Sequence, residues 1–310
     1  MSQGSVGILC SCVRMEEKRI FQALQARDVP FERIDVRWMV MGINGAPKSP
    51  HDVVLIRCLS HTRALYAAKA LGDQGVRAVN GHQAIATCGD KVLTTMALME
   101  HDVPTPRTVV AFSQGAALAT MEQMGYPVVV KPPVGSWGRL MAKLNDREAA
   151  EAVLEHKMHI GRSGAEAEAI FIQDYVDKPG RDIRTLVVGD ETVYAVYRHS
   201  AHWITNTARG GETSLCPVTP HIDSISRAAA RAVGGEVVAV DLLEAPDGSL
   251  LVNEVNHTPE FHGAVKATAV DVAGKIVDYL LGVAGGGSRD TRPATEPGHR
   301  PENWPGSSVP

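Results

Sequence analysis

The stretch V-V-A-V-D-L-L-E (Val237 to Glu244), followed by L-L-V-N-E-V-N (Leu250 to Asn256), decides the fold. Both runs are apolar and of strand type, and the Asp247-Gly248 pair between them predicts a hairpin with a two-residue turn. Such a turn pairs position 246 with position 249. Counting outward from that pair places Asp241 directly opposite Glu254 on the neighbouring strand.

Two carboxylates in opposite positions repel each other, so this pairing is unfavourable without a positive charge nearby. Asn256 shares the face of Glu254, because strand side chains repeat every two residues. Carboxylate and amide oxygens suit Mg²⁺, which completes its octahedron with water and substrate phosphates. We therefore predict a magnesium site at Asp241, Glu254 and Asn256. A loop one residue longer would move Asp241 to the opposite face, and an ordinary solvent-facing hairpin remains the alternative.

Composition narrows the function classes. The 310 residues are 44% hydrophobic, enough for a large core divided into two or three subdomains. A net charge of −4 gives no reason to expect nucleic acid as a partner. No stretch approaches the length of a membrane span, so we expect a soluble, cytoplasmic protein without a membrane partner. Five cysteines without a C-x-x-C pair indicate neither a disulfide framework nor a zinc site.

Strands and helices alternate at the start of the chain, which predicts a doubly wound α/β subdomain over residues 1–90. A central β/α subdomain is expected at 91–166 and a strand-rich subdomain at 167–284. The stretch 285–310 is rich in Gly, Pro, Ser and charge and is expected to be a disordered tail. The expected helices are Glu16 to Arg27, Arg63 to Gln74 and Lys91 to His101. The other expected strands are Val6 to Cys10, Phe31 to Val36, Val53 to Arg57, Thr108 to Ala111, Val128 to Lys131, Met141 to Leu144, Ile170 to Gln173, Ile183 to Val188 and Thr192 to Tyr197.

Residues suited to phosphate precede the hairpin. Lys131 closes the apolar run Y-P-V-V-V-K-P, and a loop with two glycines, Pro133 to Arg139, follows it directly. Backbone N–H groups in such a loop can point at an anion, although connections of this kind are more often simple turns. Arg184 and Arg198 lie on expected strands, where their planar donor groups could hold phosphate or carboxylate. A solvated or salt-bridged arginine is the alternative for both.

Six strings, in order along residues 6–282, carry a family resemblance. They are C-G-D-K at Cys88 to Lys91, G-Y-P-V-V-V-K-P at Gly125 to Pro132, G-S-W-G-R at Gly135 to Arg139, I-Q-D-Y-V-D-K-P-G-R-D-I-R at Ile172 to Arg184, Y-R-H-S-A-H-W-I-T-N-T-A-R-G-G at Tyr197 to Gly211, and the hairpin with L-V-N-E-V-N-H-T. The chain resembles the ATP-grasp carboxylate–amine ligases, and among them the LysX type, which attaches an amino acid to an amino-group carrier protein. The resemblance implies an ATP-grasp fold, in which two α+β subdomains follow the N-terminal α/β subdomain and sandwich ATP.

The resemblance also implies roles for single residues. ATP phosphates would contact Lys91, Lys131 and the closing loop Gly135, Ser136, Trp137, Gly138 and Arg139. Adenine would meet the hinge Gln173, Asp174, Tyr175 and Val176, with Asp182 near the ribose. The transferring phosphoryl group would face the catalytic residues Arg184, Arg198 and Asn206. Two Mg²⁺ ions would be held by Asp241, Glu254 and Asn256, with Glu254 bridging. The amino-acid substrate would lie near Arg209, Gly210, Gly211, His257, Thr258 and Glu260.

The implied reaction joins the α-amine of an acidic amino acid to the side chain of a carrier's C-terminal glutamate. An acyl phosphate is the intermediate, ADP is released, and the partner is a small acidic carrier protein in lysine-type or specialised amino-acid biosynthesis. The family also makes a homo-oligomer, a dimer or tetramer, plausible. The chain departs from lysine-pathway members at Thr258 to Gly263, so glutamate or a non-protein amino acid could replace α-aminoadipate. A RimK-like glutamate ligase and a non-catalytic ATP-binding module are the alternatives.

Overall fold

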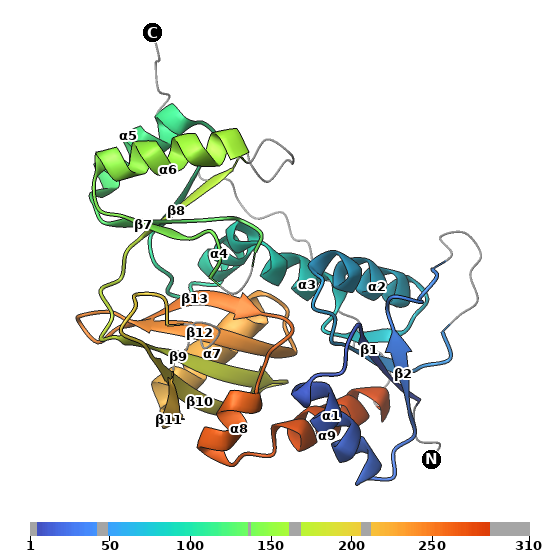
Figure 1. Ribbon diagram of the computed structural model, residues 1–310. Coiled ribbons are helices and arrows are strands. Elements are labelled where there is room, and N and C mark those ends of the chain that lie inside the picture. Colours follow the sequence, from blue (N-terminus) through green and yellow to red (C-terminus); the bar gives the residue numbers. More distant parts are fainter. Residues whose placement is uncertain (1–4, 42–48, 136–137, 161–168, 206–211, 286–310) are drawn as a thin grey trace.

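The computed structural model describes residues 5–41, 49–135, 138–160, 169–205 and 212–285, which form three β-sheets with their covering helices (Figure 1). Several residues with predicted roles lie outside the described part of the chain, and the tail from 286 onward lies outside it as well. These residues are Ser136, Trp137, Asn206, Arg209, Gly210 and Gly211. No described helix is long and apolar enough to cross a membrane.

The first sheet is parallel, has the strand order β2-β1-β3-β4 and is covered on both faces. Its strands are β1 (Val6–Cys10), β2 (Phe31–Asp35), β3 (Val53–Ile56) and β4 (Arg77–Val79). One face packs against α2 (His61–Asp73), and the other packs against α1 (Met15–Gln25) and α9 (Val272–Gly285). The doubly wound arrangement is confirmed. The last described helix completes it, because α9 returns to the start of the chain and packs beside α1 (Figure 1).

The second sheet is antiparallel, with the order β5-β8-β6-β7, and its helices cover one face only. Its elements are β5 (Thr108–Ala111), α5 (Gln114–Met124), β6 (Val128–Lys131), β7 (Ala142–Leu144), α6 (Arg147–Ile160) and β8 (Ile170–Asp174). Strand β8 pairs with β5 and β6 of this sheet, although the sequence placed residues from 167 onward in the last subdomain. We propose that the junction follows Asp174.

The third sheet is antiparallel and has the order β11-β10-β9-β12-β13. Its elements are β9 (Arg181–Val188), β10 (Glu191–His199), β11 (Glu212–Cys216), α7 (Pro220–Ala232), β12 (Val237–Glu244) and β13 (Leu250–Asn256). Helix α7 covers one face. The opposite face changes character along β9: Leu186 and Val188 join the apolar core shared with α9, whereas Asp182 and Arg184 line the site described below.

The hairpin of β12 and β13 pairs Asp241 with Glu254, as predicted, but the predicted turn is wrong. The Ala245 N–H donates to the Ser249 carbonyl, which leaves a three-residue loop, 246–248, with Gly248 at a φ of 84°. That longer loop alone would have turned Asp241 to the opposite face. A β-bulge at Asn253 restores the register, because Leu242 pairs with Val252 while Asp241 still pairs with Glu254.

Three further helices connect the sheets: α3 (His82–Gly89), α4 (Lys91–Glu100) and α8 (His262–Thr268). The Asp90 carboxylate caps α4 by accepting the Val92 N–H at 2.7 Å and the Leu93 N–H at 3.3 Å. This cap places Lys91 at the first position of α4, where its side chain faces the loop after β6. Helix α8 follows β13 directly and lies between the third sheet and the N-terminal unit (Figure 1).

Candidate active site: two cavities that meet at Glu254

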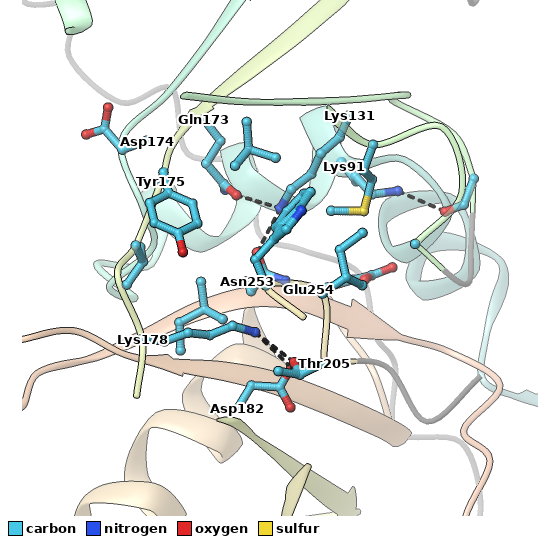
Figure 2. Close-up of a pocket in the computed structure, with 18 of the residues that line it drawn as sticks. Lys91, Lys131, Gln173, Asp174, Tyr175, Lys178, Asp182, Thr205, Asn253 and Glu254 are labelled. Carbon is cyan, nitrogen blue, oxygen red and sulfur yellow. Dashed lines mark hydrogen bonds and ion pairs between the residues drawn. The ribbon is translucent and has the colours of Figure 1, made fainter. Parts of the chain in front are cut away.

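The first cavity lies between the helix-free face of the second sheet and the third sheet (Figure 2). It contains about 740 Å³ of space free of protein atoms, part of it open to solvent. Predicted residues from separate strings meet in it, as expected for a nucleotide site. They are Lys91, Lys131, Gly135, Gly138, Arg139, Gln173, Asp174, Tyr175, Val176, Asp182 and Glu254.

Lys131 is the most deeply buried cation of this cavity, with an exposed fraction of 4%. Its ammonium group donates to the Gln173 side-chain oxygen at 2.5 Å and to the Asn253 side-chain oxygen at 2.8 Å (Figure 2). Neither partner is charged, and burial therefore lowers the pKa of Lys131 to about 8. An anion bound in the cavity would restore the preference for the charged form, which is the behaviour expected of a phosphate-binding lysine.

The loop after β6 is held against the start of α4. The Lys91 N–H donates to the Pro133 carbonyl at 2.9 Å, and the Lys91 ammonium donates to the Gly135 carbonyl at 2.8 Å. Asp90 forms an isolated bridge with Val134. The C-G-D-K string therefore positions the described edge of the glycine-bearing loop, and Lys91 reaches the first cavity beside Lys131 (Figure 2).

Lys178 and Thr205 enclose the lower side of the cavity, and sequence reasoning assigned neither of them. The Lys178 ammonium donates to the Thr205 hydroxyl at 2.7 Å and lies 3.7 Å from Asp182 (Figure 2). Burial lowers the pKa of Lys178, and Asp182 opposes that effect. Asp182 also accepts two hydrogen bonds from Arg198, at 2.6 and 2.7 Å, and one from Thr205. Its carboxylate lines the cavity, but these internal partners engage both of its oxygens.

Asp241 has an arginine on each side. Arg184 donates to both of its oxygens, at 2.7 and 2.8 Å, and Arg198 lies 3.1 Å away. Burial opposes ionisation of Asp241, but the two guanidinium charges outweigh burial and lower its pKa. The opposed carboxylates were expected to need a positive charge nearby. For Asp241, the two arginines supply that charge. The predicted role of both arginines at the phosphoryl group stays a prediction.

Glu254 and Asn256 differ from Asp241. Among the described residues, no hydrogen bond or ion pair engages the Glu254 carboxylate, and the buried side-chain nitrogen of Asn256 has no partner. The Glu254 carboxylate, left free in this way, fits a hard divalent cation, whereas the Asn256 nitrogen is a donor and fits an acceptor such as a phosphate oxygen. The described residues contain no cluster of three or more His, Cys, Asp and Glu side chains suited to a metal. A magnesium ion at this position would therefore take part of its coordination from phosphate and water.

The second cavity lies on the other side of Glu254, between the third sheet and the N-terminal unit. It shares Gly135 and Glu254 with the first cavity, and Arg184, Arg198, Asp241 and Asn256 contribute to it from the third sheet. Its remaining lining residues come from the end of α3, the start of α2 and the segments after β3, β6 and β13. They are Cys58, Leu59, His61, Cys88, Gly89, Val134, His257, Thr258, Pro259 and Glu260.

Two imidazoles face each other in this second cavity. The ring centroids of His61 and His257 are 5.9 Å apart, and His61 packs where a side chain at Gly89 would lie, 1.9 Å from an ideal Cβ. A larger side chain at Gly89, the last residue of α3, would therefore displace the His61 ring. Burial, assisted by His61 and Arg57, lowers the pKa of His257 to about 4, so this imidazole is neutral near pH 7.

Sequence reasoning missed several residues that line the cavities. Lys178 lies inside a string already quoted for the family, and that string was a usable signal. Asn253 and His61 gave none, because their positions depend on a bulge and on packing between distant units. The missed lining residues include Cys58, His61, Cys88, Met141, Lys178, Trp203, Thr205, Leu243 and Asn253.

Comparison with known families accounts for both parts of the chain. A RimK-like ATP-grasp domain matches residues 88–280, and a LysX preATP-grasp domain matches residues 6–87. The chain is a member of the RimK-like ATP-grasp family. It is an ATP-grasp ligase, and ligases of this family bind ATP with Mg²⁺.

Relatives in this ATP-grasp family are similar over most of their length. The chain is 37% identical to the glutamate–LysW ligase ArgX of Sulfurisphaera tokodaii over 277 residues, which cover 89% of this chain and 97% of the relative. It is 34% identical to the α-aminoadipate–LysW ligase LysX of Saccharolobus solfataricus over 223 residues, covering 72% and 80%. The crystal structure of a RimK domain ATP-grasp protein from Sphaerobacter thermophilus superposes with a TM-score of 0.74 at 24% identity, covering 89% of this chain and 99% of that one. This last likeness confirms the ATP-grasp fold.

Proposed function

We propose that this ligase joins the α-amine of glutamate or α-aminoadipate to the side-chain carboxyl of a C-terminal glutamate on a LysW-like amino-group carrier protein. The observation that carries the proposal is the 37% identity to a glutamate–LysW ligase over nearly the whole of both chains. Two cavities that meet at one carboxylate, Glu254, support it, because such a reaction brings a nucleotide and two further substrates to one point.

In the first step, a carboxylate oxygen of the carrier attacks the γ-phosphorus of ATP, and ADP leaves. Lys91 and Lys131 would hold the phosphates from the first cavity, while Arg184 and Arg198 face the transferring group from the second. Asp241, Glu254 and Asn256 would hold the two Mg²⁺ ions, which would neutralise charge on that group. Asp241 would exchange part of its arginine contact for the ion.

In the second step, the amine attacks the acyl carbon from the second cavity, and phosphate leaves as the amide bond forms. The ammonium form must first release a proton, because only the free amine is a nucleophile. His257 lines the cavity and is neutral near pH 7, so its imidazole does not repel the incoming ammonium group. Arg184 and Arg198 would stabilise the departing phosphate.

The choice between the two amino acids concerns the segment after β13. Thr258, Pro259 and Glu260 line the second cavity, and this segment departs from the lysine-pathway pattern. We favour glutamate, because the glutamate ligase from Sulfurisphaera tokodaii is the more similar of the two relatives described above.

The proposal extends to location and assembly: the ligase is a cytoplasmic homo-oligomer, a dimer or tetramer. Exposed apolar side chains on one face of α4, Leu93, Met96 and Met99, support self-association.

The test mixes the ligase, ATP, Mg²⁺, the carrier and one amino acid, and measures the intact mass of the carrier and the nucleotide products. We expect the carrier to gain the mass of glutamate less water, with one ADP and one phosphate formed for each transfer. AMP with pyrophosphate would contradict the acyl-phosphate chemistry. An unmodified carrier, together with transfer of glutamate to a ribosomal protein tail, would favour the RimK-like alternative, and no ATP turnover with any acceptor would favour a binding module.

A further inference from the structure

The first turn of α1 contains two buried carboxylates that the proposed reaction does not use. Glu16 is 2% exposed and Glu17 is fully buried. Glutamate is almost never buried to this extent unless it is paired, so the partners of these residues indicate what the turn does. Those partners are arginine and histidine side chains and backbone N–H groups, and several belong to the segment that follows β13.

Glu16 binds the far end of that segment. One of its oxygens accepts the N–H of Phe261 and the N–H of His262, both at 3.1 Å, and lies 2.6 Å from the His262 ring nitrogen Nδ1. Burial opposes ionisation of Glu16, but these contacts outweigh burial and lower its pKa to about 2. Phe261 precedes α8, and no side chain of its own segment caps that helix. A residue 245 positions earlier therefore supplies the missing acceptor.

Glu17 holds the near end through arginine. Arg14 donates to both oxygens of Glu17, at 2.9 and 3.1 Å, and its remaining terminal nitrogen donates to Glu260 at 3.0 Å. Arg57 donates to Glu17 from β3's C-terminal end at 2.9 Å. The short stretch from Glu260 to His262 is thus attached to the N-terminal unit at both of its ends.

The same stretch continues the wall of the second cavity, which Thr258, Pro259 and Glu260 line. We propose that Glu16 is a positioning residue for the amino-acid substrate: by holding residues 261 and 262, it fixes the cavity wall formed by 258–260. This inference rests on the proposed function, in which the second cavity accepts the amino acid. None of the anchoring residues, Arg14, Glu16, Glu17 or Arg57, lines the first cavity, so ATP binding should not depend on them.

The test compares Glu16→Gln and Glu16→Ala with Asp278→Asn. The control removes a carboxylate that ties Arg27, beyond the other end of α1, to α9 at 2.9 and 3.2 Å and that lies outside both cavities. Glutamine keeps an oxygen for the two backbone N–H groups, whereas alanine keeps none. We therefore expect the KM for the amino acid to rise about tenfold in Glu16→Ala and by less in Glu16→Gln, with the KM for ATP within about twofold of wild type. Asp278→Asn should leave both constants unchanged.

Hydrogen exchange gives a second readout that requires no substrate. The N–H groups of 261 and 262 should exchange faster in Glu16→Ala and retain wild-type rates in Asp278→Asn. Provided that the wild-type enzyme is active, three results would each overturn the inference. They are an unchanged KM for the amino acid, a parallel rise in both KM values, and unchanged exchange. A wild-type enzyme that transfers no acidic amino acid to any acceptor would instead overturn the proposed function, and this inference with it.

Discussion

Lys131 combines two properties that rarely coexist in one lysine: it is buried, and both of its hydrogen-bond acceptors are uncharged amide oxygens. Burial is the larger influence and lowers its pKa to about 8, while Glu254 raises it and Lys91 and Lys178 lower it further. The free enzyme therefore carries a full charge at this position only below about pH 8. Phosphate binding restores the charge.

A pH profile follows from that pKa. We expect kcat/KM for ATP to fall as pH rises through about 8, because free enzyme with a neutral Lys131 binds polyphosphate less well. The fall in kcat should begin at higher pH, since bound ATP favours the charged lysine.

The contribution of Lys131 to folding stability should rise over the pH range in which kcat/KM for ATP falls. The folded state releases this proton below the ordinary pKa of 10.5, so this group adds stability as pH rises from about 8 toward 10.5.

Two substitutions separate Lys131 from its neighbour. Arginine stays charged throughout this range, so Lys131→Arg should remove the fall in kcat/KM. Lys178 also has a pKa lowered by burial, and Lys178→Arg should leave the fall in place. Two results would show that Lys131 does not control ATP binding. One is a wild-type kcat/KM that stays constant up to pH 9.5, and the other is a fall in kcat/KM that disappears only in Lys178→Arg.

At the scale of elements, the hairpin of β12 and β13 shows what a bulge contributes. The three-residue loop and the extra residue at Asn253 offset each other, so Asp241 and Glu254 stay paired. The bulge also lets the Asn253 oxygen accept from Lys131. Deleting Asn253 should therefore leave a regular ladder with Glu254 still opposite Asp241, but with Lys131 short of one acceptor.

We expect the deletion of Asn253 to raise the KM for ATP about tenfold, the usual effect of a lost charge-assisted hydrogen bond, with a folded hairpin. Deleting Pro246 is the matched control, because it leaves the two-residue Asp-Gly turn that antiparallel strands favour and does not alter the ladder. Its KM should equal that of wild type. Equal KM values in both deletions would show that the Asn253 contact is dispensable.

The same hairpin marks the limit of prediction from sequence. Two apolar runs on either side of an Asp-Gly pair were enough to locate both strands, but counting from a two-residue turn paired Asp241 with Glu254 correctly only because the bulge at Asn253 offsets the longer loop. The bulge was not predictable, because the partner of Asn253 is a lysine 122 residues away. The role of Asp182 near a ribose stays a prediction, and its contacts with Arg198 and Thr205 were not predictable because they depend on the register of β9 and β10.

At the scale of the whole molecule, the N-terminal sheet and the third sheet share one apolar core. Val6, Ile8 and Leu55 belong to the same buried cluster as Leu186 and Val188, and α9 belongs to it through Val272, Ile276, Val277 and Leu280. The boundary near residue 90 therefore separates stretches of sequence rather than independent folding units. The second cavity lies between these two units, so its shape depends on the core that joins them.

Truncation tests this shared core. A chain that ends at Asp271 loses the four large apolar side chains of α9, each worth about 1.5–3 kcal/mol, which together match the stability of a typical domain. We expect it not to fold, as measured by circular dichroism. A chain that ends at Gly285 lacks only the polar, glycine-rich stretch 286–310 and should keep wild-type activity and Tm.

The milder Ile276→Ala should lower the free energy of unfolding by about 2–5 kcal/mol. It should also speed hydrogen exchange in β1 and β9 together, because both strands depend on one core. Faster exchange in β1 alone would show that the two units unfold separately.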